Sequence, residues 1–163
     1  MTFIVDGTNG LTFPNSTVQA SAGSVLQIVN ATTSTQTTVS TSTFTDTTLT
    51  ATITPKFATS KILVLVNQNG VGKETNNTQI YLRLLRDSTT IVNIERYGVH
   101  TASTASNFIG SCSTSYLDSP ATTSAIVYKT QFASQANNAV IYVQSASGGT
   151  SSTSTITLME IAA

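Results

Sequence analysis

The sequence predicts an all-β protein: a jelly-roll β-sandwich preceded by an extended N-terminal arm. Serine and threonine make up about a third of the 163 residues, whereas only 9% are charged. Threonine favours strands because its β-branched side chain suits a pleated surface. Polar and apolar residues alternate over many short runs that end at turn residues, and no window has the helical period. This combination is typical of sandwiches and barrels.

Residues 1–23 differ from the rest and are predicted to form the arm. Two apolar bursts are separated by a turn-rich run, and Pro14 ends the second burst. Neither burst is long enough to bury itself, so the arm is expected to lie on a sister copy or on a larger particle. The residues expected to dock there are Phe3, Ile4, Val5, Leu11 and Phe13. The remaining residues, 24–163, form the predicted sandwich domain.

From residue 24 onward, period-two alternation takes over. The sequence predicts strands at 24–30, 48–54, 61–66, 78–86, 89–95, 108–116, 124–132, 139–144 and 153–161. A total of about eight or nine strands fits an eight-stranded, two-sheet jelly roll best. A seven-stranded immunoglobulin-type sandwich is the alternative, and it is less favoured because the chain has no tryptophan and only one cysteine.

Several segments carry an expectation of their own. The strand 61–66, KILVLV, is apolar on both faces, which predicts burial on two sides or a subunit contact. Asp87 and Ser88 separate two alternating runs and predict a β-hairpin. The Thr/Ser-rich run 31–43 is left open between an edge strand and an exposed loop. The segments 67–77 and 96–107 are predicted to be loops.

Charge and hydropathy exclude several classes of partner. Seven lysines and arginines balance seven acids, and a nucleic-acid surface needs a basic excess. No segment approaches the ~20 apolar residues of a membrane helix, and the N-terminus lacks the basic and apolar regions of a signal peptide. We therefore expect a soluble chain, made in a reducing compartment, that binds no nucleic acid and inserts in no membrane. A surface near zero net charge also favours self-association.

The sequence predicts no catalytic residue, no cofactor and no metal site. The acids are spread over the chain, at Asp6, Asp46, Glu74, Asp87, Glu95, Asp118 and Glu160. One histidine and one cysteine cannot build a zinc site within one chain, although a trimer axis could collect copies of His100. Cys112 is expected to be a small, partly buried strand residue, and its pairing with His100 as a nucleophile is a remote alternative.

The remaining polar and aromatic residues are given structural roles. Asp118 precedes Ser119 and Pro120 and is expected to form an Asx-type turn. The pairs 73–74 and 96–97 are expected to be solvated residues on loop tips, and Arg83 and Glu95 a weak surface ion pair. The tyrosines and phenylalanines are assigned to core or subunit contacts, and the absence of tryptophan gives no support to a sugar-binding platform.

Several sequence motifs of the chain resemble those of a known family. GLTFPNSTVQASA, residues 10–22, resembles a phrase near the start of tail-fibre-like and other virion proteins of tailed phages, cyanophages especially, with Asn15-Ser16 in place of the usual Asp-Gly. LTATITPKFATSKILVLV, LLRDSTTI, YLDSPATTSAIVYK and STITLMEI look like successive strand-and-turn phrases of a jelly-roll family of marine and freshwater phages. The resemblance implies a fold similar to the trimeric jelly rolls of the tumour-necrosis-factor and C1q type, and it carries over no catalytic residues.

Together these observations predict a non-enzymatic structural protein of a phage virion, assembled in the host bacterial cytoplasm and placed on the particle exterior. A homotrimer acting as a capsid cement or decoration protein is narrowly preferred, with the major capsid protein as partner. The alternative is a tail-fibre head domain that contacts a tail protein and presents its loops to a host glycan or receptor. A polysaccharide-degrading enzyme is the remote third class.

Overall fold

The computed structural model describes residues 4–6, 10–12, 18–19, 24–103, 107–147 and 150–162. Every regular element in these ranges is a β-strand. These ranges contain no helix long and apolar enough to cross a membrane. The strands are β1 (Ile4–Asp6), β2 (Gly10–Thr12), β3 (Val18–Gln19), β4 (Val25–Thr33), β5 (Thr37–Val39), β6 (Thr45–Ile53), β7 (Lys61–Lys73), β8 (Gln79–Arg86), β9 (Thr89–Gly98), β10 (Asn107–Asp118), β11 (Ile126–Gln135), β12 (Ile141–Val143), β13 (Ala146–Ser147), β14 (Thr150–Ser151) and β15 (Ser154–Ile161). The predicted all-β class is confirmed.

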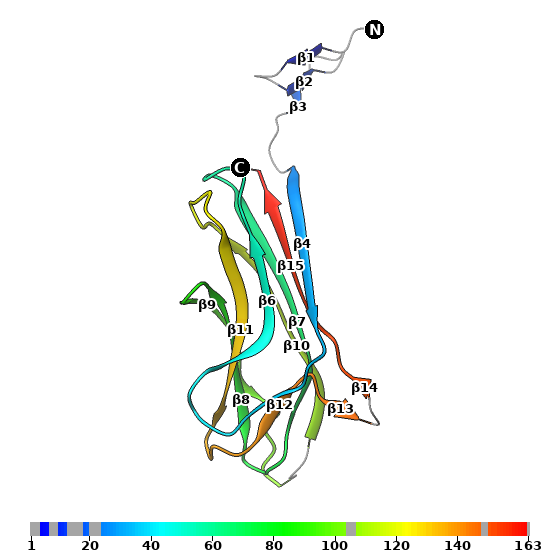
Figure 1. Cartoon of the computed structure of the whole chain (residues 1–163), viewed down its shortest axis with the longest axis vertical. Coiled ribbons are helices and arrows are strands. Elements are labelled where there is room, and N and C mark those ends of the chain that lie inside the picture. The colour runs from blue at the N-terminus through cyan, green and yellow to red at the C-terminus, as the bar shows by residue number, and fades with distance from the viewer. Residues whose placement is uncertain are drawn as a thin grey trace.

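Two antiparallel sheets face each other as a β-sandwich (Figure 1). Sheet I contains β4, β15, β7 and β10 in that order, and β12 and β5 continue it beside the C-terminal end of β7. Sheet II has the order β6-β11-β8-β9. Strands that are neighbours in space are therefore mostly distant in sequence, as β4 and β15 illustrate.

The segment predicted to be an arm contains three short strands that pair only with one another. β1, β2 and β3 form a separate antiparallel sheet, which lies beyond the end of the sandwich where β4 begins (Figure 1). Of the residues expected to dock, Phe3 and Phe13 lie outside the described residues. Ile4, Val5 and Leu11 are strand positions whose side chains are likewise outside the description. Docking of the arm therefore stays a prediction.

The predicted hairpin at Asp87 is confirmed. Arg86 pairs with Thr89 across a two-residue turn, and Asp87 adopts a φ of 52°, which aspartate tolerates better than most residues. The turn is also tied to sheet II: Asp87 N donates to Val127 O at 2.7 Å, and Val127 N donates to Asp87 Oδ1 at 3.0 Å. The Thr/Ser-rich run before β6 resolves into the end of β4 and the short edge strand β5.

The prediction of a loop at 67–77 is wrong up to Lys73, because β7 continues to that residue, whereas residues 74–77 lie in bends and turns as predicted. Its far half pairs with β10 and β12, and its two glycines allow close packing. A Cβ at Gly72 would stand 2.3 Å from the ring of Tyr142. Gly70 has a φ of 62°, and a Cβ there would stand 2.3 Å from Ser145 N. The glycines that suggested a loop are required by chain segments that pass close to a long strand.

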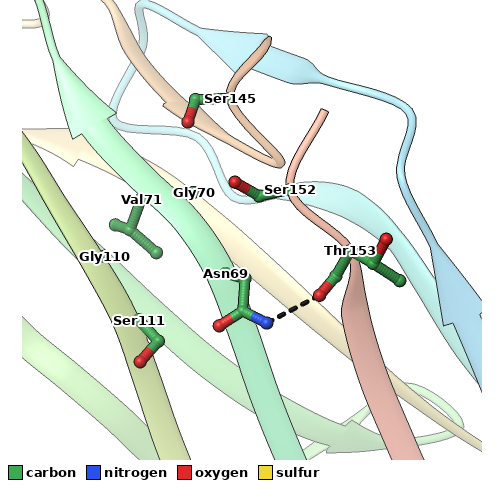
Figure 2. Close-up of a pocket in the computed structure, with 8 residues that line it drawn as sticks. All are labelled: Asn69, Gly70, Val71, Gly110, Ser111, Ser145, Ser152 and Thr153. Atoms are coloured by element: carbon green, nitrogen blue, oxygen red, sulfur yellow. Dashed lines mark hydrogen bonds between the residues drawn. The ribbon is translucent and has the colours of Figure 1, made fainter. Parts of the chain in front are cut away.

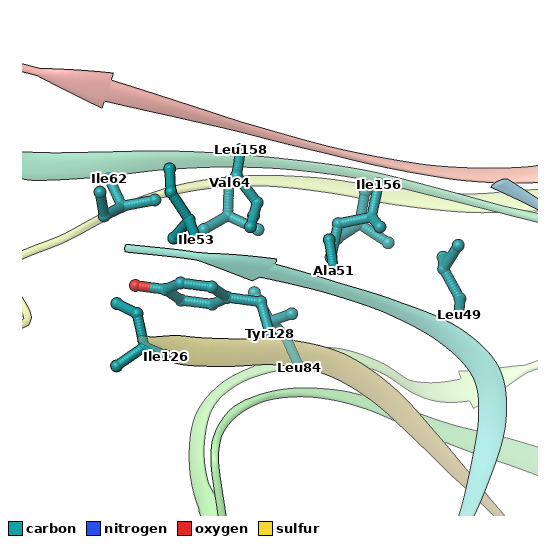
Figure 3. Close-up of a cluster of buried hydrophobic side chains, with 11 residues drawn as sticks. Leu49, Ala51, Ile53, Ile62, Val64, Leu84, Ile126, Tyr128, Ile156 and Leu158 are labelled. Atoms are coloured by element: carbon teal, nitrogen blue, oxygen red, sulfur yellow. The ribbon is translucent and has the colours of Figure 1, made fainter. Parts of the chain in front are cut away.

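The interior of the sandwich has two apolar clusters. The larger joins Leu49 and Ile53 of β6 to Val64 of β7, and the ring of Tyr128 lies among them (Figure 3). The smaller surrounds Phe132 of β11 and Ile141 of β12. Inward-facing residues alternate with outward-facing ones along each strand, so one face of each sheet supplies the core.

Buried polar side chains from both sheets form a chain of hydrogen bonds inside the sandwich. Thr47 bonds Thr130, Thr130 Oγ1 donates to Gln68 Oε1 at 2.9 Å, and Gln68 Nε2 donates to Ser154 Oγ at 3.0 Å. Gln144 Nε2 and Asn69 N also donate to Ser154 Oγ, at 2.9 and 2.8 Å. Because a buried polar group without a partner costs about 1–3 kcal/mol, this network fixes the relative position of the two sheets.

Candidate functional site

The outward face of sheet I carries an apolar row that crosses all four of its main strands. Met159 of β15 pairs with Ile28 on one side and Leu63 on the other, and Leu63 pairs with Leu117 of β10. Ile28 is 58% exposed and Leu117 48% exposed. Leu65, 39% exposed, adds to the row on β7. We call these five side chains the apolar row.

The surroundings of the apolar row are almost uncharged. On β10 the outward residues before Leu117 are serines, on β15 they are threonines, and on β4 they are asparagine and threonine. Among the outward-facing residues described on these strands, Lys61 at the start of β7 is the only charged one. A continuous apolar sheet face of this kind is typical of a surface that another molecule covers. KILVLV predicted one strand of it, and the structure adds the other three.

The outward face of sheet II is polar and internally paired. Asp46 Oδ2 accepts from Lys129 Nζ at 2.9 Å, and Asp46 Oδ1 accepts from Gln131 Nε2 at 2.7 Å. Arg83 donates to Gln131 Oε1 and lies 3.7 Å from the ring centroid of Phe44. Burial opposes ionisation of Asp46, but the bonds from Gln131 and Lys129 outweigh it and lower the pKa of this carboxyl. The two outward faces of the sandwich therefore differ in chemistry.

The expected ion pair between Arg83 and Glu95 does not form. Arg83 binds Gln131, and Glu95 Oε1 accepts from the backbone N–H groups of Arg96 and Tyr97 at 2.8 and 2.9 Å. The cause is the register: Arg83 pairs with Asn93, because β9 contains extra residues relative to β8.

Asp118 has a larger role than the predicted turn. Its Oδ1 accepts from Ser119 N at 2.9 Å, as expected for an Asx turn. In addition, Arg86 Nη1 lies 3.0 Å from both carboxylate oxygens, and Tyr128 OH donates to Oδ2 at 2.7 Å. Burial and the bond to Asp118 raise the pKa of Tyr128. Asp118, at the end of β10 in sheet I, is thereby joined to β8 and β11 of sheet II.

Glu160 is a buried carboxylate that holds the loop before β7. It accepts from Gln27 Nε2 at 2.5 Å, Lys56 N at 2.7 Å and Phe57 N at 3.4 Å. Burial alone would raise its pKa, but these hydrogen bonds outweigh that effect and lower the pKa of Glu160. The side chain of Phe57 stays 56% exposed beside this clamp.

Three of the four residues expected on loop tips belong to strands instead, whereas Glu74 lies at an exposed bend just after β7, as expected. Lys73 is fully buried in β7, where burial lowers its pKa and Nζ donates to Thr101 O at 3.3 Å and to Thr101 Oγ1. Arg96 and Tyr97 lie in β9 and contact Tyr81 of β8. Tyr97 is 67% exposed and therefore lies outside the core. Sequence gave no signal for either placement, because strand length here depends on partners far along the chain.

An open pocket of about 580 Å³ lies where β7 bends past β10 and the β13–β14 hairpin. Asn69, Ser111, Ser145, Ser152 and Thr153 supply its polar groups (Figure 2). Asn69 Nδ2 is already bound to Thr153 O at 2.6 Å. No acid, histidine or cysteine lines it, so its walls offer hydrogen bonds but no acid–base group.

The remaining reactive groups are separated. Within the described ranges, no three of the histidine, cysteine and acidic side chains gather as a metal site would require. Burial, and then the charge of Glu95, raise the pKa of the Cys112 thiol to about 11, so it stays protonated. His100 is exposed, two residues beyond the end of β9. Asp87, Glu95 and Asp118 each bind the different groups described above.

Comparison with known proteins gives no match to any protein-family model or to any curated protein.

Proposed function

We propose that this chain is a non-enzymatic structural protein of a tailed-phage virion, a jelly roll that assembles as a homotrimer on the particle exterior. The observation that carries the proposal is the apolar row, which leaves Ile28, Leu65 and Leu117 substantially exposed on one almost uncharged sheet face. Burial of such a face between copies stabilises an assembly by about 25 cal/mol per Å² of apolar surface. A symmetric self-contact also needs no charge complementarity, in keeping with the zero formal net charge.

The jelly-roll part of the proposal is supported by strand order. Numbered by their order in the chain, the eight long strands β4, β6, β7, β8, β9, β10, β11 and β15 run 1-8-3-6 in sheet I and 2-7-4-5 in sheet II. This is the order that two interlocked Greek keys produce. An immunoglobulin-type sandwich, with ABED and CFG sheets, would place these strands differently.

The phage part rests on the resemblance of five sequence motifs. The preferred placement is that of a cement protein that sits over junctions between major capsid proteins, with the apolar row covered by other copies of the chain. The alternative is a tail-fibre head domain, which would attach through residues 1–23 and present its loops to a host surface.

The test is to locate the chain in purified particles. A cement protein is present in many copies on every head, including heads that lack tails, whereas a tail-fibre protein disappears with the tails. Deletion of residues 1–23 is expected to abolish particle binding while the sandwich still unfolds cooperatively. Absence of the chain from particles would overturn the proposed function, and retained binding after the deletion would overturn the role of the arm.

A further inference from the structure

The edge strand β9 carries three irregularities in its pairing with β8. Successive partners of Ile80, Leu82 and Arg83 are Gly98, Glu95 and Asn93, so β9 has more residues than β8 over this stretch. Such bulges re-aim side chains and are frequent next to functional sites. At the first of these irregularities Arg96 and Tyr97 lie opposite a single residue of β8, Tyr81, and Glu95 Oε1 accepts both of their backbone N–H groups.

The bulge brings two consecutive side chains onto one ring. In a regular strand, neighbours point to opposite faces. In β9, by contrast, the Arg96 Cζ lies 5.0 Å from the centroid of the Tyr81 ring, and the Tyr97 ring meets Tyr81 edge-on, with centroids 6.1 Å apart and planes at 68°. Tyr81 lies on the outward face of sheet II, since its neighbours Ile80 and Leu82 are buried. We call Tyr81, Arg96 and Tyr97 the aromatic platform.

The chemistry of the platform is unused within the described part of the chain. The ion pairs found there are Arg86–Asp118 and Lys129–Asp46, so no carboxylate neutralises Arg96. Tyr97 engages only an edge contact and leaves 67% of its surface in water. Glu95, the acid that precedes Arg96 in the chain, accepts from the backbone through Oε1. It pairs with the buried Leu82 of β8, which places Glu95 on the inner side of β9.

We propose that the aromatic platform binds an acidic saccharide, with the sugar ring against Tyr97 and its carboxylate on Arg96. A pyranose presents a face of C–H groups that packs on an exposed aromatic ring. A guanidinium presents a planar fork that matches a carboxylate bidentately. The stack on Tyr81 holds that fork in place before the ligand arrives, which reduces the entropy lost on binding. The site lies on sheet II, away from the apolar row, and does not rest on the proposed assembly.

The experiment titrates the full chain with an α-linked galacturonate tetramer, followed by calorimetry and by the ring resonances of the five tyrosines. The matching galactose tetramer is the neutral probe. We expect the acidic probe to bind with a Kd of about 1 mM, and Arg96→Gln and Tyr97→Ala each to weaken binding by about fivefold or more. Tyr97→Phe, which keeps the ring, is expected to retain most of the affinity.

Matched controls are Lys56→Gln and Phe57→Ala, which remove one cation and one exposed aromatic ring at the other end of the molecule. Both are expected to bind as the unaltered chain does. No binding of the acidic probe at about ten times the expected Kd would overturn the proposal. The proposal would also be overturned if Arg96→Gln and Tyr97→Ala bound the acidic probe as tightly as the unaltered chain does. Equal affinity of the unaltered chain for the neutral and acidic probes would overturn it as well. Failure of self-association would leave these outcomes unaffected, since they concern the other face.

Discussion

At the scale of single residues, the molecule depends on buried polar groups that link separate strands. Ser154 Oγ receives three donors, from Gln68, Asn69 and Gln144, and all of these bonds lie inside or beside the core. Asp118 and Glu160 act similarly at one end of the sandwich. About a third of the residues are serine and threonine. Buried, hydrogen-bonded serines and threonines therefore cannot be distinguished from exposed ones by residue type alone.

Removal of the Ser154 hydroxyl is expected to be costly. Ser154→Ala removes the hydroxyl that Gln68, Asn69 and Gln144 contact and leaves buried donors without an acceptor, so we expect the free energy of unfolding to fall by about 2–3 kcal/mol. Urea denaturation measures this change. Ser42→Ala, at an exposed bend, is the matched control and should change stability by less than about 0.5 kcal/mol. Equal effects of the two substitutions would contradict the role of Ser154.

The lowered pKa of Glu160 predicts how the free energy of unfolding depends on pH. Its pKa in the folded chain is lowered from the usual 4.5, so its stabilising effect is complete above that value and is lost as the pH falls through the lower, folded pKa. We expect Glu160→Gln to destabilise the fold by about 1–3 kcal/mol at neutral pH, and the difference to shrink below about pH 4.5.

The measurement for Glu160 is urea denaturation of the unaltered chain and the variant between pH 3 and pH 7, about the range over which a carboxyl titrates. Subtracting the two curves removes the contribution of other acids, such as Asp46. Glu74→Gln, at an exposed position, is the control and should leave the curve unchanged. A difference that stays constant with pH would show that the carboxylate charge at Glu160 is not what stabilises the loop.

At the scale of elements, sequence patterns found where strands lie but not how far they extend. Alternation placed β6, β8 and β11 within a few residues, because their inward faces bury apolar side chains against the other sheet. It failed on β7 beyond Val66, where asparagine, glycine and lysine suggested a loop. Those residues are held in the strand by β10 and β12, which lie far along the sequence.

The close approach of β7 and β12 can be tested at Gly72. A methyl group there would overlap the ring of Tyr142, so Gly72→Ala is expected to destabilise the chain by about 1–3 kcal/mol. Tyr142→Leu removes the ring, and the double variant should therefore be less destabilised than the sum of the two single changes. Strict additivity in urea denaturation would contradict the contact.

The candidate sites were predicted only in part, for the same reason. KILVLV indicated either burial on two sides or a subunit contact for one strand, but the apolar row is recognised only from the register of four strands. The aromatic platform was invisible in the sequence, because a bulge in β9, and not the spacing of residues, brings Arg96 and Tyr97 to Tyr81. The periodicity of side chains predicts regular strand pairing but does not predict where β-bulges interrupt it.

At the scale of the whole molecule, we propose different functions for the two outward faces of the sandwich. Sheet I presents an apolar, almost uncharged surface suited to other copies of the chain. Sheet II presents paired charges and the aromatic platform to the surroundings. A neutral chain with these two faces is expected to self-associate through sheet I until the apolar row is covered.

The most direct test of this account is the mass of the chain in solution, measured by sedimentation equilibrium at micromolar concentration. We expect three times the 17.0 kDa of one chain, and a single chain mass for Ile28→Lys and Leu117→Lys, which place charges in the apolar row. Thr50→Lys, on the outward face of sheet II, should leave the trimer intact. A 17.0 kDa species for the unaltered chain, or a trimer that survives both lysine substitutions, would contradict the central claim.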